Sequence, residues 1–542
     1  HDALPIWRTM GQCDVNETVQ AGGQAALDGP LSAPTPATEP KGKARGKGPT
    51  AAKKTASPSK RPPPHAKQMM DLAEQHRAEL FTSAGDGFAA VDIGKRRATL
   101  RIDSAEFAKL LRCWLYEAQQ TVASAQAVAE AQATLAARAR YTGSEQPVYL
   151  RTGKAGDALY LDLGTADGQA VEVTPQGWRV IPRPPVHFLR PAGMQPLPMP
   201  VRGGNLAELF TFINTPEDCQ PLLLAWLMFA LSPDGPFPLL AVHGEQGSGK
   251  STGCRMLRQL VDPHDAALRS VPRDDRNLMI STRHGWLLGF DNLSSLPPWL
   301  SDLLCGIATG TATAARSLYT DDGEALFQAK RPILLNGIEE VATRADLLDR
   351  CLVVSFQTIP EERRRSEAEL WAAFQTARPR IFGALLDALA CALRQLPQVK
   401  LPRSPRMVDF AKWGTAAESA LGLPSGGFLD AYFQNIRAAC DLPIEASAIA
   451  GPLQALLKQQ GQTLDGAAPC WTGTATELLK ELRAVADDEV KRQSNWPRNP
   501  QLLSGELKRL APNFRQKGIH IEHGRSATAK RTRGITVRGE PC

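Results

Sequence analysis

The sequence predicts an α/β fold with a central parallel sheet. Short apolar runs at residues 237–242, 286–290 and 331–335 each lead into a glycine-rich or polar segment, and stretches with helical periodicity separate them. Apolar strands that alternate with helices are typical of a parallel sheet buried on both faces. We therefore expect the polar residues that follow these strands to gather at one edge of the sheet.

The length and composition indicate a globular protein of several domains. At 542 residues the chain is too long for one ordinary core, since domains average about 150 residues. Hydrophobic residues make up 43% and charged residues 22%, which excludes a collagen-like or fully disordered chain. The net charge of +7 is concentrated near residues 41–67 and again after Lys508, a distribution that favours an anionic partner.

The first 67 residues predict a disordered linker. They are rich in Pro, Lys, Ala and Gly and contain too few large apolar groups to offset the entropy of ordering. Their role is either to tether or to hold nucleic acid loosely through lysines. The opening HDALPI resembles a translated sequencing adaptor, so we expect the natural chain to continue upstream of residue 7.

Residues 68–204 predict a region of helices followed by a small antiparallel sheet. The stretch 68–140 is mostly helical in pattern, with strand-like runs near 88–102, and Tyr116–Ala139 contains no Gly or Pro. Alternating runs between residues 148 and 188 are separated by turn residues and predict the sheet.

Membrane insertion and metal frameworks are not expected. The longest apolar run, 222–231, is half of the roughly 20 residues that a spanning helix needs, and no secretory signal is recognisable. We therefore expect a cytoplasmic protein. The ten cysteines are scattered singly, without a CxxC pair, so we expect reduced thiols rather than zinc sites or disulfides.

A phosphate-binding loop follows the first apolar run. The segment GEQGSGKS satisfies GxxxxGK[ST] between a predicted strand and a predicted helix. Its backbone N–H groups are expected to surround the phosphates of ATP, while Lys250 contacts the outer phosphates and Ser251 binds Mg²⁺. The predicted nucleotide-binding residues are Gly244, Glu245, Gln246, Gly247, Ser248, Gly249, Lys250, Ser251 and Thr252.

Three further residues complete the predicted catalytic set. Asp291 ends the second apolar run, 41 positions after Lys250, and is expected to hold Mg²⁺ together with Ser251. Asn336 ends the third run, where an amide can orient the attacking water. Arg350 precedes the next apolar strand, from which an arginine can reach the γ-phosphate bound by a neighbouring subunit.

This set of motifs resembles superfamily 3 helicases, a branch of the AAA+ ATPases found in small DNA viruses and in phage-type primase-helicases. The resemblance covers about residues 205–358 and is carried by GEQGSGKS, LLGFDN, PILLN and DR before an apolar strand. It implies that Asn336 is sensor 1 and Arg350 the arginine finger, with Arg344 as the competing candidate. It also implies a DNA-contacting hairpin within residues 306–334.

Two departures from the family pattern bear on activity. Asn292 stands where the family usually has a second acidic residue that activates water, and Glu245, Asp302 and Glu339 remain open as substitutes. The expected hairpin tip, 321–323, is acidic where the family tends to carry a lysine. Arg316, Lys330 and Arg331 are alternative DNA contacts, or else charges at a solvated hairpin base.

The C-terminal part predicts helices at 361–465 and then a winged helix at 466–542. Two helical patterns, 474–485 and 499–510, precede a two-stranded wing, an order that resembles domains appended to phage-type primase-helicases. The alternative is a winged helix that binds protein. The predicted DNA-binding residues here are Lys508, Arg509, Arg525, Lys530 and Arg531, with Arg515, Lys517 and Arg533 nearby.

The favoured function is an ATP-dependent DNA helicase or translocase that uses ATP and Mg²⁺. It would be the motor part of a replication protein of a phage or mobile element, would act on single-stranded or forked DNA, and would assemble as a homo-oligomeric ring, expected to be a hexamer. A primase domain upstream is compatible with this assignment. The alternatives are a DNA-binding ATPase switch or loader without unwinding activity and a small-molecule kinase, which needs neither a trans arginine nor a winged helix.

Overall fold

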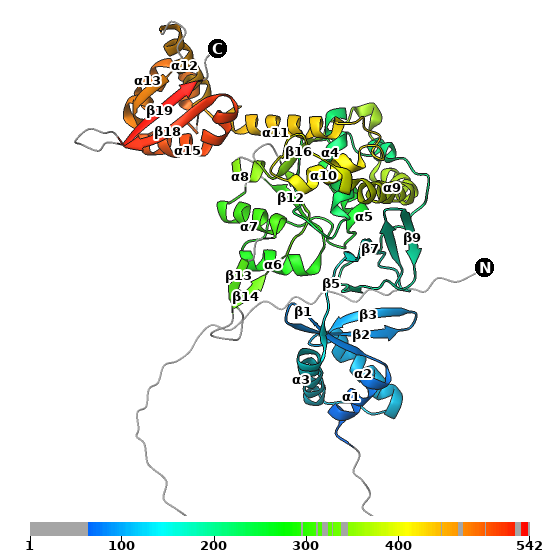
Figure 1. Cartoon of the computed structure of the whole chain (residues 1–542). Coiled ribbons are helices and arrows are strands. Elements are labelled where there is room, and N and C mark those ends of the chain that lie inside the picture. Colours follow the sequence, from blue (N-terminus) through cyan, green and yellow to red (C-terminus); the bar gives the residue numbers. More distant parts are fainter. Residues whose placement is uncertain are drawn as a thin grey trace, which may run out of the picture. The chain divides into compact units, whose positions relative to one another are not determined.

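The computed structural model describes most of the chain after Pro62. The described residues are 63–293, 296–310, 313–316, 324–327, 329–337, 345–445, 447–463, 470–493, 495–525 and 533–539. They belong to one unit, which runs from Pro63 to Cys542 (Figure 1). The predicted linker lies outside them, except for residues 63–67, where a helix already begins at His65.

The first part of the described chain combines one mixed sheet with three helices. Its elements are α1 (His65–Gln75), β1 (Glu79–Ser83), β2 (Asp86–Ile93), β3 (Arg96–Arg101), α2 (Ala105–Gln119), α3 (Ala125–Thr142) and β4 (Ser144–Glu145). The strand order is β3-β2-β1-β4. Met69, Phe107, Leu111 and Leu135 are buried in the core between the sheet and the helices.

Two helices divide the stretch Tyr116–Ala139, although it contains no Gly or Pro. Gln120 ends α2 with a left-handed φ of 54°, and Ser124 begins α3 by accepting a hydrogen bond from the backbone N–H of Ala127. A serine at this position competes with helix continuation because its hydroxyl satisfies an N–H of a new first turn. Propensity alone could not reveal this break.

The predicted antiparallel sheet is present in the next part. It consists of β6 (Thr152–Ala155), β7 (Ala158–Asp162), β8 (Ala170–Thr174) and β9 (Gly177–Ile181), paired in that order. Two short strands, β5 (Val148–Tyr149) and β10 (His187–Phe188), pair separately. The sheet packs on α9 (Glu367–Gln395), and the Trp178 Nε1–H donates to Asp387 Oδ1 at 2.8 Å.

The predicted parallel sheet forms the centre of the chain. Its strands are β11 (Leu239–His243), β12 (Leu288–Leu293), β15 (Ile333–Gly337) and β16 (Cys351–Ser355), in the order β12-β15-β11-β16, all parallel. The surrounding helical elements are α4 (Gln220–Ala230), α5 (Lys250–Val261), α6 (Asp275–His284), α7 (Pro298–Thr309) and α8 (Ala345–Leu348). A 3₁₀ helix, Leu206–Thr211, precedes α4.

A short hairpin and a group of helices complete the central part. The hairpin pairs β13 (Thr313–Arg316) with β14 (Glu324–Phe327) within the region where a DNA-contacting hairpin is predicted. Its tip at residues 321–323 lies outside the described residues. The helices that follow β16 are α9, α10 (Val408–Ala417), α11 (Gly427–Glu445) and α12 (Ala450–Thr463).

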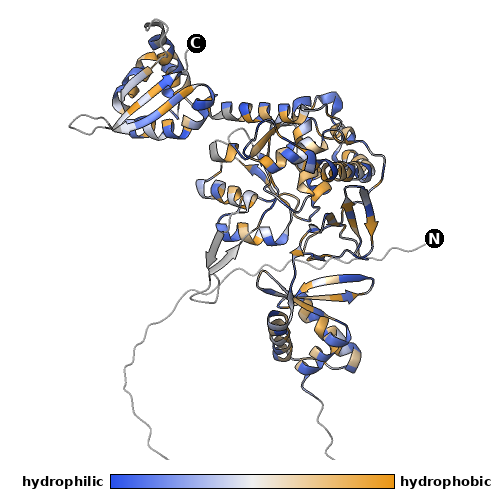
Figure 2. Cartoon of the chain, viewed as in Figure 1, coloured by the Kyte–Doolittle hydropathy of each residue, from blue (hydrophilic) through white to orange (hydrophobic). Residues whose placement is uncertain are grey.

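The C-terminal part forms its own core around a three-stranded antiparallel sheet. Its elements are β17 (Cys470–Thr474), α13 (Ala475–Val485), α14 (Asp488–Arg492), α15 (Pro500–Gln516), β18 (Ile519–Arg525) and β19 (Arg533–Gly539), and the strand order is β17-β19-β18. Figure 2 shows apolar and hydrophilic residues alternating along these strands. The sequence predicted two of the strands but not β17, and it predicted a helix that ends at Leu510, six residues before the observed end.

Among the described helices, none combines the length and the apolar character that crossing a membrane requires.

A buried carboxylate joins the central sheet to the antiparallel sheet. Asp262, directly after α5, accepts a hydrogen bond from Arg151 Nε at 3.0 Å, and both side chains are almost fully buried. Its second oxygen accepts from the backbone N–H groups of Trp286 and Leu287, at 2.9 and 3.1 Å, where the chain enters β12. Arg258 Nη2 lies 3.6 Å from the same oxygen.

Desolvation on its own would raise the pKa of Asp262. The charges of Arg151 and Arg258, together with the hydrogen bonds, outweigh that effect and keep the pKa of Asp262 below its ordinary value. The folded protein therefore holds an ionised carboxylate between two buried guanidinium groups. Such an arrangement is costly to break because each partner, left alone, becomes an unpaired buried charge.

We predict that Asp262→Asn lowers the free energy of unfolding by about 3–5 kcal/mol, because it leaves Arg151 buried without a counter-charge. The matched control is Asp234→Asn, which removes an exposed ion pair with Lys154 and should cost less than about 1 kcal/mol. Denaturant unfolding followed by tryptophan fluorescence measures both.

The same carboxylate predicts a dependence on pH. Because the folded pKa of Asp262 is depressed, its stabilising contribution is complete above the unfolded pKa of about 4 and is lost as the pH falls through the folded value. The difference between wild type and Asp262→Asn should therefore shrink in acid. A difference below about 1 kcal/mol at neutral pH would contradict the assigned role.

Candidate functional site

The glycine-rich loop connects β11 to α5 and adopts a backbone that requires glycine. Gly244, Gly247 and Gly249 have φ values of 150°, 87° and 73°. A Cβ at Gly244 would lie 2.3 Å from the carbonyl oxygen of Phe356, so no other residue fits there. Gly249 precedes the first turn of α5, whose free N–H groups favour an anion at this end of the helix.

The side chains of the loop are held close to its own backbone. Lys250 Nζ donates to the carbonyl oxygens of Gly244 and Glu245, at 2.5 and 2.7 Å. The buried Ser248 hydroxyl donates to Glu245 O at 2.9 Å, and Thr358 Oγ1 donates to Glu245 Oε2 at 3.1 Å. These contacts hold the Lys250 ammonium at the loop, where phosphate oxygens could replace the carbonyl oxygens as its acceptors.

Three of the predicted residues meet at the carboxyl edge of the sheet. Ser251 Oγ donates to Asp291 Oδ1 at 3.0 Å, and Asn336 Nδ2 donates to Ser251 Oγ at 3.0 Å and also to Asp291 Oδ1. They meet because β15 lies between β11 and β12, with Asn336 paired to Val242 in register. Residues 85 positions apart therefore share one cluster.

Asn336 has one unused acceptor inside this cluster. The residue is 2% exposed, and its Oδ1 has no hydrogen-bond partner among the described residues. A buried amide oxygen without a donor is costly unless the functional state supplies a donor, such as a bound water. This atom fits the predicted water-orienting role, since it lies beside the predicted Mg²⁺ ligands Ser251 and Asp291.

The donor set also suits Mg²⁺ held jointly by protein and nucleotide. Within the described part of the chain, no group of three or more His, Cys, Asp and Glu side chains could hold a metal ion alone. Mg²⁺ is commonly bound by one or two protein oxygens together with phosphate oxygens and waters. Ser251 and Asp291 provide one hydroxyl and one carboxylate for such a site.

Asn292 occupies an unusual backbone position after the predicted metal ligand. Its φ is 56°, its side chain is exposed, and the register between β12 and β15 shifts between Phe290 and Leu293. Its N–H donates to Asp291 Oδ1 at 2.9 Å, which orients that carboxylate. Asn tolerates this left-handed conformation better than Glu does, so the backbone itself favours Asn here.

The alternatives for activating water are not resolved by the structure. Glu245 lies in the loop and accepts from Thr358, and Asp302 lies on the exposed face of α7. Glu339 is outside the described residues. Sequence patterns did not identify Phe356 and Thr358 as neighbours of the loop; the one available signal is that both follow the strand paired with β11.

Arg350 lies at the opposite edge of the sheet from the loop. Cys351 pairs with Leu239 and Ser355 with His243, so Arg350 precedes β16 at the amino end. Five strand residues separate the two edges, a distance of about 16 Å at ~3.3 Å per residue. Arg350 and the glycine-rich loop of the same chain therefore lie at opposite edges of the sheet. This position is compatible with the predicted action of Arg350 on a neighbouring subunit. Arg344 lies outside the described residues.

The predicted DNA-binding residues near the hairpin differ in their surroundings. Arg331 is engaged within the chain: its Nε donates to Thr282 O at 3.2 Å, its guanidinium lies 5.2 Å from the Trp286 ring centroid, and desolvation lowers its pKa to about 10. A DNA contact by Arg331 would have to break these interactions. Lys330 is half-buried, and the side chain of Arg316 is not described.

The basic residues of the C-terminal part lie on α15 and at the strands. Lys508 and Arg509 are exposed on α15, and Arg509 Nη2 lies 3.8 Å from Glu506. Desolvation, and then the charge of Lys508, lower the pKa of His523, so Lys508 on α15 lies near His523 on β18. Lys517 pairs with Asp441 of α11 at 2.8 Å. Lys530, Arg531 and the side chain of Arg525 lie outside the described residues.

Two family models match the chain. Residues 204–441 match "Actinomycete integrative conjugative element replication protein" and residues 449–541 match "AICE RepA C-terminal domain". Together the matches span more than half of the chain and contain the loop, Asp291, Asn336, Arg350 and α15. We find no match among curated proteins.

Two solved structures are similar at low identity. The apo C-terminal region of NrS-1 shares 10% identity over 87% of this chain and 98% of its own, with a TM-score of 0.38. The active helicase Cch of SCCmec type IV shares 11% over 83% of this chain and 90% of its own, with a TM-score of 0.41. At these scores the likeness carries no argument about this chain.

We predict that Asp291→Asn removes the contribution of Mg²⁺ to ATP binding, because the amide lacks the charge that attracts the ion. Affinity measured without Mg²⁺ should change little, while the gain on adding Mg²⁺ should fall by at least about tenfold. Titration with a fluorescent ATP analogue measures this. The control is Asp409→Asn, which changes an exposed carboxylate on α10. Equal Mg²⁺ dependence in wild type and Asp291→Asn would contradict the assignment.

Proposed function

We propose that this chain, a replication protein of the integrative-conjugative-element type by its matches at residues 204–441 and 449–541, is an ATP-dependent DNA helicase or translocase of superfamily 3 type. The observation that carries the proposal is the cluster of Ser251, Asp291 and Asn336 beside Lys250, in a sheet ordered β12-β15-β11-β16. A strand that carries an amide between the loop strand and the carboxylate strand is what hydrolysis by an oriented water needs.

In this proposal, separate groups of residues bind the phosphates of ATP, bind Mg²⁺ and orient the attacking water. The loop N–H groups and Lys250 bind the phosphates, and Ser251 and Asp291 hold Mg²⁺, which neutralises phosphate charge when bound. Asn336 Oδ1 accepts a hydrogen bond from the attacking water and orients it. The exposed Asn292 is not a base, so another carboxylate, or the phosphate itself, accepts the proton.

The proposal includes a ring, because Arg350 lies at the edge of the sheet away from its own loop. In a closed ring with head-to-tail contacts, one subunit presents its loop and the next presents Arg350. The transition-state charge would then be stabilised in trans, and hydrolysis would be coupled to movement of the β13–β14 hairpin along single-stranded or forked DNA. A hexamer is the proposed assembly.

The C-terminal part is proposed to be a winged helix that binds DNA. The order α12-β17-α13-α15-β18-β19, with β17 joined to the edge of the β18–β19 pair, supports this assignment. α15 would be the recognition helix, with Lys508 and Arg509 on its exposed face, and the β18–β19 pair would be the two-stranded wing.

A second function is favoured by one observation. Asn292 and its left-handed backbone leave β12 without an acidic residue after Asp291. A chain that binds ATP tightly and hydrolyses it slowly would act as a DNA-binding switch or loader rather than as a motor. DNA-dependent turnover separates the two.

We predict that single-stranded DNA stimulates ATP hydrolysis and that both Lys250→Ala and Arg350→Ala abolish it. A mixture of the two inactive variants should regain activity, because an intact loop in one subunit can meet an intact Arg350 in the next. For independent sites and random assembly at a 1:1 ratio, about a quarter of the interfaces are complete. Steady-state hydrolysis over a range of ratios measures this.

The matched control is Arg406→Ala, which removes an exposed arginine paired with Asp349 and should leave turnover intact. Absence of recovery in every mixture would exclude Arg350 from a shared site. Tight ATP binding with negligible turnover that is indifferent to DNA would replace the motor with the switch.

We predict that Lys508→Ala/Arg509→Ala weakens DNA binding at every sequence and lowers the slope of log affinity against log salt by about 2. The control Lys458→Ala/Lys480→Ala removes the same charge from α12 and α13, outside the proposed recognition helix. Fluorescence anisotropy at several salt concentrations measures both. Identical slopes in the two double variants would argue for the protein-binding alternative.

A further inference from the structure

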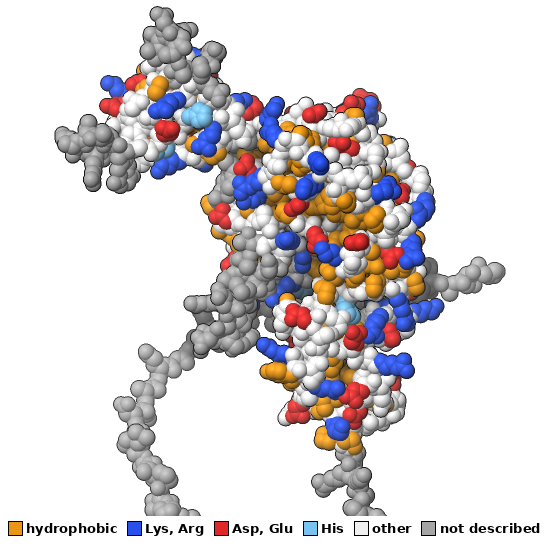
Figure 3. All heavy atoms as spheres, in the orientation of Figure 1, with side chains coloured by type: hydrophobic (Ala, Val, Ile, Leu, Met, Phe, Trp, Pro, Cys, Tyr) orange, Lys and Arg blue, Asp and Glu red, His pale blue; other side chains and the backbone are white. Residues whose placement is uncertain are grey.

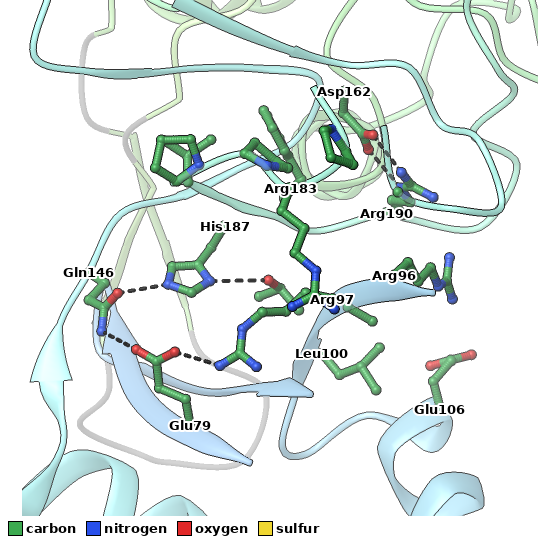
Figure 4. Close-up of a pocket in the computed structure, with 18 residues that line it drawn as sticks. Glu79, Arg96, Arg97, Leu100, Glu106, Gln146, Asp162, Arg183, His187 and Arg190 are labelled. Atoms are coloured by element: carbon green, nitrogen blue, oxygen red, sulfur yellow. Dashed lines mark hydrogen bonds and ion pairs between the residues drawn. The ribbon is translucent and has the colours of Figure 1, made fainter. Parts of the chain in front are cut away.

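A pocket rich in arginine lies outside the nucleotide site. Its volume is about 470 Å³, and it is enclosed by β3, by the turn at Gly168 and by the segment 182–190 that contains β10. Four arginines line it: Arg96, Arg97, Arg183 and Arg190. We call it the arginine pocket. In Figure 3, Lys and Arg side chains gather beside a histidine around the β3 and β5–β9 region, and Figure 4 shows the pocket itself.

Two of the arginines are fixed by carboxylates. Arg190 donates from Nε and Nη2 to the two oxygens of the buried Asp162, at 2.7 and 2.6 Å, and from Nη1 to Thr165 O. Arg97 donates to Glu79 Oε2 at 2.7 Å on the opposite wall (Figure 4). These ion pairs consume two of the three carboxylates that line the pocket.

The other two arginines have no carboxylate partner within the described residues. Arg96 is half-buried; desolvation and then the charge of Arg190 lower its pKa, and the charge of Asp162 acts in the opposite direction. Arg183 extends from the segment toward Arg97 (Figure 4). The one carboxylate left unpaired is that of Glu106, exposed on the first turn of α2.

The walls that carry these charges are rigid. Pro182, Pro184 and Pro185 flank Arg183, and proline fixes φ, so little backbone entropy is lost in this segment when a ligand binds. On another wall of the pocket, His187 Nε2 donates to Gln146 Oε1 at 2.7 Å, and Gln146 Nε2 donates to Glu79 Oε1 at 3.0 Å. This chain of hydrogen bonds ends on the Glu79–Arg97 pair and joins β10 to β1 and β3.

Contact at Gly168 restricts Arg96 in the same way. A Cβ at Gly168, whose φ is +78°, would lie 2.8 Å from Arg96 Cβ. The turn at Gly168 therefore packs directly against the Cβ end of the Arg96 side chain and does not contact its guanidinium. Leu100 and the three prolines supply apolar surface beside the charges.

We propose that the arginine pocket is a second phosphate-binding site, in which Arg96 and Arg183 hold a phosphate group and the apolar wall packs against an attached sugar or base. Guanidinium forks match phosphate oxygens in geometry and charge, and among the described residues neither Arg96 nor Arg183 forms an ion pair with a carboxylate. The phosphate belongs either to a nucleic-acid strand or to a free nucleotide. The inference does not depend on the proposed ATPase activity.

Chemical modification of arginine by phenylglyoxal tests the pocket in the full-length protein. Mass spectrometry gives the modification rate of each arginine with and without a single-stranded oligodeoxynucleotide, inorganic pyrophosphate or ATP. The ATP arm uses Lys250→Ala, so that binding at the glycine-rich loop does not contribute. Exposed Arg112 and Arg140, on α2 and α3 outside the pocket, are internal controls.

We expect Arg96 and Arg183 to be protected several-fold while Arg112 and Arg140 are unaffected. Protection by the oligonucleotide alone assigns the phosphate to a strand, and protection by pyrophosphate or ATP assigns it to a free ligand. Equal rates with and without every ligand would overturn the proposal, whatever the outcome for ATP hydrolysis.

A pair of double variants provides the second measurement. Arg96→Ala/Arg183→Ala should weaken binding of the protecting ligand by about a hundredfold or more, since both charged contacts to the phosphate are lost. Arg112→Ala/Arg140→Ala removes the same charge and should leave the affinity unchanged. Equal affinities in the two double variants would contradict the site, and thermal unfolding of each checks that it is folded.

Discussion

The ionised carboxylate of Asp262 is the interaction on which the arrangement of the site depends. It lies at the end of α5, the helix that begins at Lys250, and its oxygens bind Arg151 and the N–H groups that open β12, the strand of Asp291. One buried charge therefore fixes the helix of the phosphate loop relative to the strand of the metal carboxylate. Because Arg151 directly precedes β6, the first strand of the antiparallel sheet, its bond to Asp262 attaches that sheet to the same carboxylate.

The order of the parallel strands then sets the chemistry. With β15 between β11 and β12, Asn336 falls between Ser251 and Asp291 and donates to both. Its Nδ2 is consumed by these contacts, which leaves Oδ1 facing the cluster without a donor. A side chain locked by two hydrogen bonds is well suited to orient a third group, because it loses little further freedom on binding.

The same sheet separates the two charges that the proposed hydrolysis uses. Lys250 lies at the carboxyl edge and Arg350 at the amino edge, one strand length apart. A parallel strand cannot bring its two ends together, so a single chain cannot place both groups on one phosphate. This geometric constraint makes assembly part of the proposed mechanism. This constraint does not involve Asn292, whose left-handed backbone belongs to the local register shift of β12.

Local patterns in the sequence determined the elements that carry the nucleotide site. The glycines of the loop, the apolar runs and the residues that end them follow rules of spacing and backbone conformation, so Lys250, Asp291 and Asn336 could be placed on strands and turns without a structure. The antiparallel strands and α15 were predicted for the same reason. The break at Gln120 has no comparable signal in composition, because a serine cap interrupts a stretch of high helix propensity.

Only the tertiary structure decided which distant residues meet. Arg151 and Asp262 are 111 positions apart, and nothing in their surroundings marks them as a pair. Arg96 and Arg183 share a pocket only because β3 packs against the proline segment, and Arg331, basic and close to the predicted hairpin, proved to stack on Trp286. Sequence periodicity reports the face on which a residue lies, whereas its partner is set by how whole elements pack, through contacts that leave no local pattern.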